Sequence, residues 1–429
     1  MPEADVRGLT FYSYRRTSFA AGALIAVVDV WLVLSTTTPG FHLWADLVTA
    51  LSASTLYSGT IAAGCAAFEA NRWSHAHEHR LRSAPRSPLS DRLLHFITVA
   101  VPLVGGYAAA LVCALVVALV TDAYGRPSPL WLSAIAASLV LAAACGYAIG
   151  SLAAPYWFVA PAVALTFYAA YIVLRVSDVP FWAASLFPVL TSQDSVFVRH
   201  LTPTIAAHVC FFLSGALLLV IVGGGRMGLQ RWRLASTLVV VSVAVATSAA
   251  AFVAGHGQYT TGHNPRDFTC RGDDGVHLCL NVGYASAMEP MLEGLREMNA
   301  RMAGTPLTAA DLEQNVEGIG DDPKGNARSI YLEQLAGPRD IAFSLFRYVS
   351  KYGGTPACRV ESAADAESAA AVSYVNYWLS GYDETFYGTP PGYQHLAALR
   401  ALSLPAANAW FREHYLEYET CTLDLGDLP

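Results

Sequence analysis

Four cysteines near the end of the chain have a number and spacing suited to disulfide chemistry. They are Cys270, Cys279, Cys358 and Cys421. Four cysteines allow three pairings. We expect Cys270 to pair with Cys279 and Cys358 with Cys421, because the first pair closes a short loop that contains glycines. Disulfides form in oxidising compartments, so these cysteines predict that the region lies outside the cytoplasm. Buried free thiols are the alternative, and the absence of a C-x-x-C pair argues against zinc.

Two other groups of residues suggest metal chemistry without meeting its requirements. The run from Glu413 and His414 superficially suggests a metalloprotease helix, but the zinc signatures need a second histidine at a set helical spacing. In the other group, a helix would place His75 and His79 on one face and turn His77 away from it. We therefore predict no metal site and no catalytic residues, so that the chain is not itself an enzyme.

The class of the protein follows from long apolar runs. Hydrophobic residues make up 54% and charged residues 14% of the 429 positions, whereas ordinary soluble domains carry about 25% charged residues. A bilayer core needs about 20 apolar residues per helix, and the sequence supplies this length about seven times. The predicted spans are 19–37, 44–68, 96–120, 130–152, 156–175, 203–222 and 233–254. We predict an α-helical polytopic membrane protein, in which Pro155 lies either at a turn between two spans or at a kink within one.

Arginines in the short connections predict the orientation of the spans. The connections expected on the cytoplasmic side carry Arg7, Arg15, Arg16, Arg72, Arg80, Arg82, Arg86, Arg92, Arg226, Arg231 and Arg233. The opposite connections carry only Arg126, Arg175 and Arg199. This asymmetry predicts a multi-pass protein of the cell (plasma) membrane with a cytoplasmic N-terminus and an external C-terminal region.

These assignments divide the chain into a transmembrane domain at 1–254 and an extracytoplasmic domain at 255–429. A Ser-x-x-Glu capping box at 286–289, followed by methionines and leucines at helical spacing, predicts a helix with a buried face. A Thr-x-x-Asp box at 308–311 predicts the start of a second helix. The other predicted elements are a strand at 329–335 and helices at 340–352, 366–379 and 405–418. The external domain is therefore expected to be mainly helical.

Polar and small residues inside the spans are candidates for a pathway or a subunit seam. Asp29 interrupts an apolar run, and a carboxylate in the membrane is costly unless it faces protein, water or a partner. Asp29 either lines a transport pathway or dimer seam, or pairs with a polar neighbour purely for structure. Gly146 and Gly150 form a small-xxx-small face that permits close helix packing, and we place them at the same pathway or seam.

A basic segment at 69–92 lies between the second and third predicted spans. It contains Glu69, Asn71-Arg72, Glu78, Leu81 and the run Ala84-Pro85-Arg86-Ser87. This pattern resembles the coupling segment of type-2 ABC exporter permeases, where an acidic residue and an arginine-containing stretch lead into a short helix and a Pro-x-Ser-like turn. An interrupted external segment at 178–199 also resembles that family.

The resemblance implies that this segment docks on a separate ATPase subunit. The residues implied in coupling are Glu69, Arg72, Trp73, Glu78, Leu81, Arg82 and Pro85. An ordinary positive-inside loop is the alternative. The seventh span and the external domain depart from the usual six-span member of the family, which leaves the substrate and the direction of transport open.

The partners and cofactors follow from the same resemblance. The chain has no G-x-x-x-x-G-K-[ST] phosphate loop, which is the motif that cradles nucleotide phosphates. ATP and Mg are therefore expected on the ATPase subunit, with no cofactor on this chain. Two permease halves would enclose the transport pathway, either as a homodimer of this chain or as this chain with a second permease. The expected cargo is an apolar or amphipathic compound. No nucleic-acid partner is expected. The alternative is a membrane-anchored extracytoplasmic binding, sensor or hydrolase protein.

Overall fold

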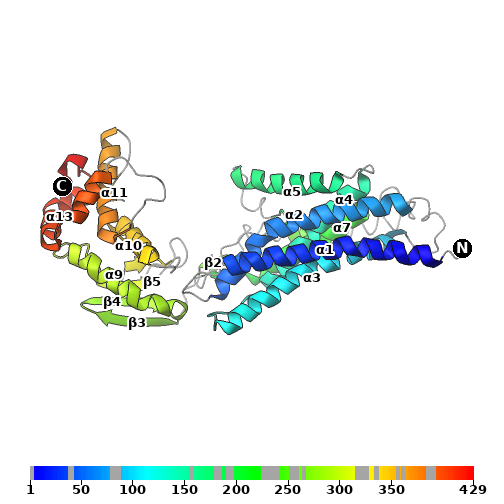
Figure 1. Cartoon of the computed structure of the whole chain (residues 1–429), viewed down its shortest axis with the longest axis horizontal. Coiled ribbons are helices and arrows are strands. Elements are labelled where there is room, and N and C mark those ends of the chain that lie inside the picture. The colour runs from blue at the N-terminus through cyan, green and yellow to red at the C-terminus, as the bar shows by residue number, and fades with distance from the viewer. Residues whose placement is uncertain are drawn as a thin grey trace. The chain divides into compact units, whose positions relative to one another are not determined.

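The computed structural model shows a chain that folds into two compact units (Figure 1). The first unit comprises residues 1–37, 43–195 and 199–261, and the second comprises 38–42, 196–198 and 262–429. The structure describes residues 4–36, 43–77, 88–153, 158–177, 186–189, 198–223, 239, 241–250, 260–262, 267–314, 328–332, 338–353, 358, 363–382 and 393–429.

The first unit is helical. Its helices are α1 (Ala4–Thr36), α2 (Trp44–His77), α3 (Pro88–Val120), α4 (Pro129–Leu152), α5 (Val159–Val176) and α7 (Thr202–Val222), followed by an apolar helix at Val241–Ala250. Four stretches are long and apolar enough to cross a membrane: Arg16–Ser35, Leu89–Val120, Pro129–Leu152 and Thr202–Val222. The prediction of apolar helices of membrane length is thus confirmed for α1, α3, α4 and α7.

Among the described residues the other three predicted spans also contain helix, but that part of the chain does not meet both criteria. The apolar helices described there are shorter, at Val159–Leu174 and Val241–Ala250, and most of the remaining positions of these two predicted spans lie outside the described residues. Helix α2 is long but rich in hydroxyl groups. Ser54 and Thr55 are buried, and their hydroxyls donate to backbone carbonyls one turn earlier at 2.9 and 2.6 Å. Such bonds satisfy polar groups inside a helix bundle. Seven crossings stay a prediction.

Small residues let α2 pack closely against α4 and α5. A Cβ on Gly146 would lie 1.9 Å from the Ala63 carbonyl oxygen, and one on Gly150 would lie 2.1 Å from that of Ala67. Helices α2 and α4 therefore run parallel. Helix α5 runs antiparallel to both, because Gly59 faces Phe167 whereas Gly64 faces Ala160 and Ala164. Helix α4 ends at Leu152 with Ala153 extended, and Pro155, predicted to lie at a turn or at a kink, lies outside the described residues.

The second unit contains a four-stranded sheet of order β3-β4-β5-β6. The strands are β3 (Phe268–Asp273), β4 (Val276–Asn281), β5 (Asp311–Gln314) and β6 (Arg328–Ile330). Strands β3 and β4 form an antiparallel hairpin, and β4-β5 and β5-β6 pair in parallel. Asp274 and Gly275 connect the hairpin with φ angles of 46° and 79°, as a type I′ turn requires. A separate two-stranded sheet pairs β1 (Val198–His200) with β2 (Thr260–Gly262).

Helices pack on this sheet and on one another. They are α9 (Met288–Arg301), α10 (Pro338–Tyr352), α11 (Ala363–Ser380), α12 (Tyr393–Ala401) and α13 (Leu404–Glu419), with short 3₁₀ helices η2 (Val282–Ala287) and η5 (Leu425–Asp427). The predicted helices at 340–352, 366–379 and 405–418 are confirmed, as is the buried face of α9, which carries Met288, Met291, Leu292, Leu295, Met298 and Met302. Figure 1 shows α9 along the β3-β4 hairpin.

Two local predictions in this unit are wrong. The box at 308–311 does not start a helix, because Leu312 and Gln314 are buried alternately in β5, whose pairing with β4 and β6 outweighs the local capping signal. The capping box at 286–289 predicted Ser286 as the N-cap of this helix, whereas the N-cap of α9 is Ala287, which makes no side-chain cap bond. The predicted strand at 329–335 is confirmed in part, as β6.

Candidate functional site

The C-terminal end of α2 carries a group of aromatic and polar residues that we call the α2-end cluster: Asn71, Trp73, Arg92, His95 and Tyr147. Trp73 is 6% exposed and stacks on the imidazole of His95 in α3, with ring centroids 5.1 Å apart. His95 Nδ1 lies 3.0 Å from the Tyr147 hydroxyl of α4, at hydrogen-bond distance. The cluster thus connects three helices through side chains.

Tyr147 is the centre of this cluster. Its side chain is fully buried. The ring of Phe96 meets it edge to face at 5.4 Å, and the guanidinium of Arg92 lies 5.6 Å from the ring centroid. Both arrangements match favourable interactions of an aromatic quadrupole. Tyr147 therefore holds a cation and two aromatic rings of α3 against α4.

Hydrogen bonds at the same end connect α2, α4 and α7. The Asn71 amide donates to the carbonyls of Gly150 and Ala153 at 3.1 and 3.3 Å, which belong to the end of α4, where carbonyls lack partners within the helix. The Ser151 hydroxyl lies 3.2 Å from the Gly223 carbonyl and can donate to it. The ends of these three helices are thus held together by polar side chains.

Two ionisable groups are buried at this end of the helices: Arg92, which belongs to the α2-end cluster, and Glu69, which lies close to Asn71 of that cluster in sequence. Glu69 is 1% and Arg92 is 3% exposed. Thr17 and Arg72 lie near the Glu69 carboxylate, but within the described residues neither carboxylate oxygen, nor Arg92 Nε, has a hydrogen-bond partner that meets normal geometry. Burying charged groups costs free energy unless they are paired. Glu69 of α2 and Arg92 of α3 are therefore buried ionisable groups whose hydrogen bonding is incomplete within the described residues.

The residues of the predicted coupling segment fall into two sets. Glu69, Arg72 and Trp73 lie in the last turns of α2, with Arg72 5.4 Å from the Phe68 ring centroid. Because Trp73 packs inside the first unit, it does not present its ring for docking. Glu78, Leu81, Arg82 and Pro85 lie outside the described residues, and α3 begins at Pro88.

Asp29 is fully buried in α1, at the contact with α2. The Ser58 hydroxyl of α2 donates to its Oδ1, while Oδ2 has no hydrogen-bond partner within the part of the chain that the structure describes. Tyr107 of α3 lies near the same carboxylate. Ser54 also lies near this carboxylate, so the polar neighbours that a structural role requires are present.

Gly146 and Gly150 contact α2 of the same chain, as the close approach to Ala63 and Ala67 shows. The face that they form is thus filled within the first unit. Packing against α2 already accounts for both glycines. Their location at a transport pathway or subunit seam stays a prediction.

In the second unit the disulfides follow the favoured pairing. Cys270 is bonded to Cys279, and Cys358 to Cys421. The remaining cysteines, all on helices of the first unit, are Cys65, Cys113, Cys145 and Cys210. His414 has no second histidine in a metal-binding arrangement in the described chain; its Nδ1 lies 2.9 Å from the Trp410 carbonyl. Nothing here supports a protease site.

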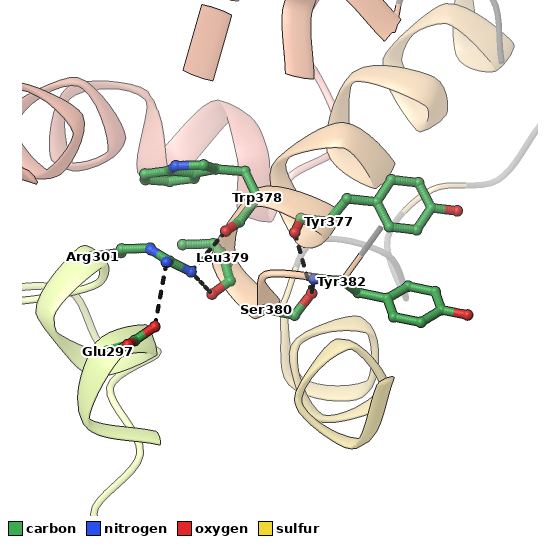
Figure 2. Close-up of polar contacts among 7 residues, drawn as sticks. All are labelled: Glu297, Arg301, Tyr377, Trp378, Leu379, Ser380 and Tyr382. Carbon is green, nitrogen blue, oxygen red and sulfur yellow. Dashed lines mark hydrogen bonds and ion pairs between the residues drawn. The ribbon is translucent and has the colours of Figure 1, made fainter. Parts of the chain in front are cut away.

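Arg301 joins the ends of α9 and α11 (Figure 2). Its Nη1 donates to the carbonyls of Trp378 and Leu379 at 3.0 and 2.9 Å, and Nη2 lies 3.7 Å from the Glu297 carboxylate. Burial lowers the pKa of the guanidinium, and Glu297 partly opposes this. Figure 2 also shows the Ser380 hydroxyl accepting a bond from the Tyr382 amide at 3.2 Å. This arrangement caps the carboxyl end of α11 and is structural.

Sequence reasoning missed His95 and Tyr147, and it counted Arg92 only as a loop charge. A usable signal was present: Arg92 and His95 are one helical turn apart at the start of an apolar run, so that both fall on one face of α3. Tyr147 stands beside Gly146 in a run of small residues, where a large side chain must fill the space between helices.

Comparison with protein-family models, with curated proteins and with solved structures gives no match to this chain.

Proposed function

We propose that this chain is the transmembrane subunit of an ABC-type exporter that moves an apolar or amphipathic compound. In this proposal a separate ATPase subunit binds ATP and Mg, and two permease halves enclose the pathway. The proposal requires seven crossings, with the N-terminus and the basic segment in the cytoplasm and the second unit outside. The four helices of membrane length and apolarity support the membrane part of this proposal.

The observation that carries the proposal is the continuity of α2. The helix runs without interruption from Trp44 to His77, and its last turns are locked to α3 by Trp73 and to α4 by Asn71. The rest of the basic segment at 69–92 continues from there along the chain. A force applied to this segment would therefore act on α2, α3 and α4 together.

Such a connection is what an ATP-driven transporter needs. A motor that closes in the cytoplasm can move membrane helices only through an element that is firmly packed at their ends. Packed interiors transmit displacement because they are dense and have low compressibility. The α2-end cluster supplies this packing, and the arginines that follow it suit an acidic groove on a partner.

The test is co-purification of this chain from its native membrane in mild detergent. We expect a nucleotide-binding subunit at near-equal amount, and we expect Glu78→Ala and Arg82→Ala to abolish stimulated ATPase activity while the protein stays folded. Arg126→Ala is the matched control, because Arg126 is an exposed arginine in the opposite connection. Reproducible absence of an ATPase subunit, or full activity in both variants, contradicts the proposal.

A second candidate is a membrane-anchored external binding, sensor or hydrolase protein. The observation that favours it is the second unit, which forms a compact body with its own sheet, core and disulfides. A ligand or activity that belongs to the full chain without any ATPase partner would select this candidate.

A further inference from the structure

The Cys270–Cys279 disulfide lies on the exposed face of the four-stranded sheet. Cys270 pairs directly with Cys279 across the hairpin, and Gly272 pairs with His277. Side chains two residues apart on a strand point to the same side, so Cys279 and His277 share this face with Cys270. In β5, Asp311 is the register partner of His277. The hairpin thus gathers two sulfurs, an imidazole and a carboxylate.

The distances between these groups are short. Cys279 Sγ lies 4.0 Å and Asp311 Oδ1 lies 3.8 Å from His277 Nδ1. One ligand atom from each of Cys270, His277 and Cys279 falls within 4.8 Å of the others, and this is the only such group of three within the described parts of the chain. The side chains of His277 and Asp311 are 54% and 60% exposed, so a dissolved ion or a thiol could reach them.

We propose that this hairpin is a redox-controlled metal site: oxidised, it holds a disulfide, and reduced, it binds a soft divalent cation of the Zn²⁺ class. Cys270 and Cys279 supply two thiolates and His277 a neutral imidazole, with Asp311 beside the fourth position. The inference does not depend on the transport function proposed above.

Conversion of the oxidised site to the reduced site needs a dithiol as electron donor. One donor thiolate attacks a sulfur of the disulfide, the Cys270–Cys279 bond breaks, and a mixed disulfide forms. The second donor thiolate displaces the remaining cysteine, so that the donor leaves as a disulfide and two electrons pass to this chain. Both cysteines then hold protons that came from the donor. Binding of the cation releases these two protons to solvent, because thiolates and not thiols are the ligands.

The geometry suits this ion. Zn²⁺ binds sulfur at about 2.3 Å and imidazole nitrogen at about 2.0–2.1 Å in a tetrahedron, which places two sulfurs about 3.8 Å apart. Any disulfide holds its two sulfurs about 2.05 Å apart, so binding of the ion after reduction requires the sulfurs to move apart by less than about 2 Å. Rotation of two side chains supplies that distance without moving the strands.

The β3-β4 hairpin should stay folded when the Cys270–Cys279 disulfide is reduced. Strands β3 and β4 pair along their whole length, from Phe268 with Asn281 to Asp273 with Val276, and β4 pairs with β5. Leu278 and Leu280 are fully buried. The second disulfide is different, because Cys358 and Cys421 join segments 63 positions apart and have no metal-binding group around them among the described residues. It serves as the internal control.

The experiment titrates Co²⁺ into the full chain in detergent, after reduction with a phosphine and its removal without air. Co²⁺ reports thiolate ligation by a charge-transfer absorption. We expect one Co²⁺ per chain in the reduced protein, its displacement by Zn²⁺, and no such absorption in the oxidised protein. His277→Ala should weaken binding at least tenfold, an effect no smaller than the loss of an outer-shell partner.

Two double variants make the result decisive. Cys358→Ser with Cys421→Ser should leave the absorption unchanged, whereas Cys270→Ser with Cys279→Ser should remove it while the four cysteines of the first unit remain. Far-ultraviolet circular dichroism checks that both variants fold. Equal Co²⁺ absorption in reduced wild type and in the Cys270→Ser, Cys279→Ser variant, or no absorption in either, would overturn the proposal.

Discussion

The indole of Trp73 at the end of α2 lies flat against the imidazole of His95 near the start of α3, at 15° between the ring planes. The two residues are 22 positions apart in the chain. Because their rings stack, the end of α2 and the start of α3 are held at a fixed spacing. The end of α2 is therefore a place where a substitution should disturb the packing of two helices at once.

Trp73→Ala should destabilise the first unit by about 3–5 kcal/mol, the usual cost of removing a large buried aromatic ring. If the chain works with an ATPase subunit as proposed above, the same change should lower stimulated ATPase activity more than basal activity. Thermal unfolding in detergent measures the first effect. Trp31→Ala is the matched control, because Trp31 is 65% exposed on α1 and its loss should cost far less. Equal losses in the two variants would show that Trp73 does not lock the helices.

Gly146→Ala should destabilise the bundle, because the added Cβ would lie 1.9 Å from the Ala63 carbonyl oxygen and the helices would have to separate. Overpacking of this kind costs about 1–3 kcal/mol. Gly105→Ala is the control on another helix, since a Cβ there meets nothing within 4 Å. That change should stabilise α3 by up to about 1 kcal/mol through helix propensity. The same unfolding measurement applies, and a tolerated Gly146→Ala would contradict the close packing of α2 and α4.

Arg301→Ala should destabilise the second unit by about 2–3 kcal/mol, because it leaves the partly buried carbonyls of Trp378 and Leu379 without a charged donor. Arg296→Ala is the control. Arg296 pairs with Asp273 and Asp274 at the surface with 49% of its side chain exposed, and exposed ion pairs contribute about 0–1 kcal/mol. Urea unfolding of the full chain, followed by tryptophan fluorescence, should separate the two. A larger loss for Arg296→Ala would reverse this assignment.

Much of the fold could be predicted because the deciding signal is local. A run of about 20 apolar residues forms a helix long enough to cross a bilayer. Helices α1, α3, α4 and α7 could therefore be predicted by counting consecutive apolar residues. The buried methionines of α9 follow from helical spacing in the same way. Both disulfides follow from cysteine number and the short loop between Cys270 and Cys279.

The features that could not be predicted depend on partners distant in the chain. Asp311 carries a helix-start signal but lies in strand β5, because that strand pairs with β4 on one side and with β6 on the other. The β3-β4 hairpin was missed although Asp274-Gly275 is a strong turn signal. Within the candidate site, Tyr147 and His95 are 52 positions apart. Sequence spacing cannot predict that such residues meet, because their contact depends on how α3 and α4 pack against each other.

Removing each disulfide separately should destabilise the second unit unequally. In the chain-entropy account, a closed loop stabilises the fold more when it is longer, by about 2.7 kcal/mol for a loop of ten residues and about 4.3 kcal/mol for one of 64 residues. The two bonds join cysteines 9 and 63 positions apart. Cys358→Ser with Cys421→Ser should therefore lower the unfolding midpoint in urea more than Cys270→Ser with Cys279→Ser. The reverse order would mean that the hairpin needs its disulfide to form, because strand pairing alone does not hold β3 on β4.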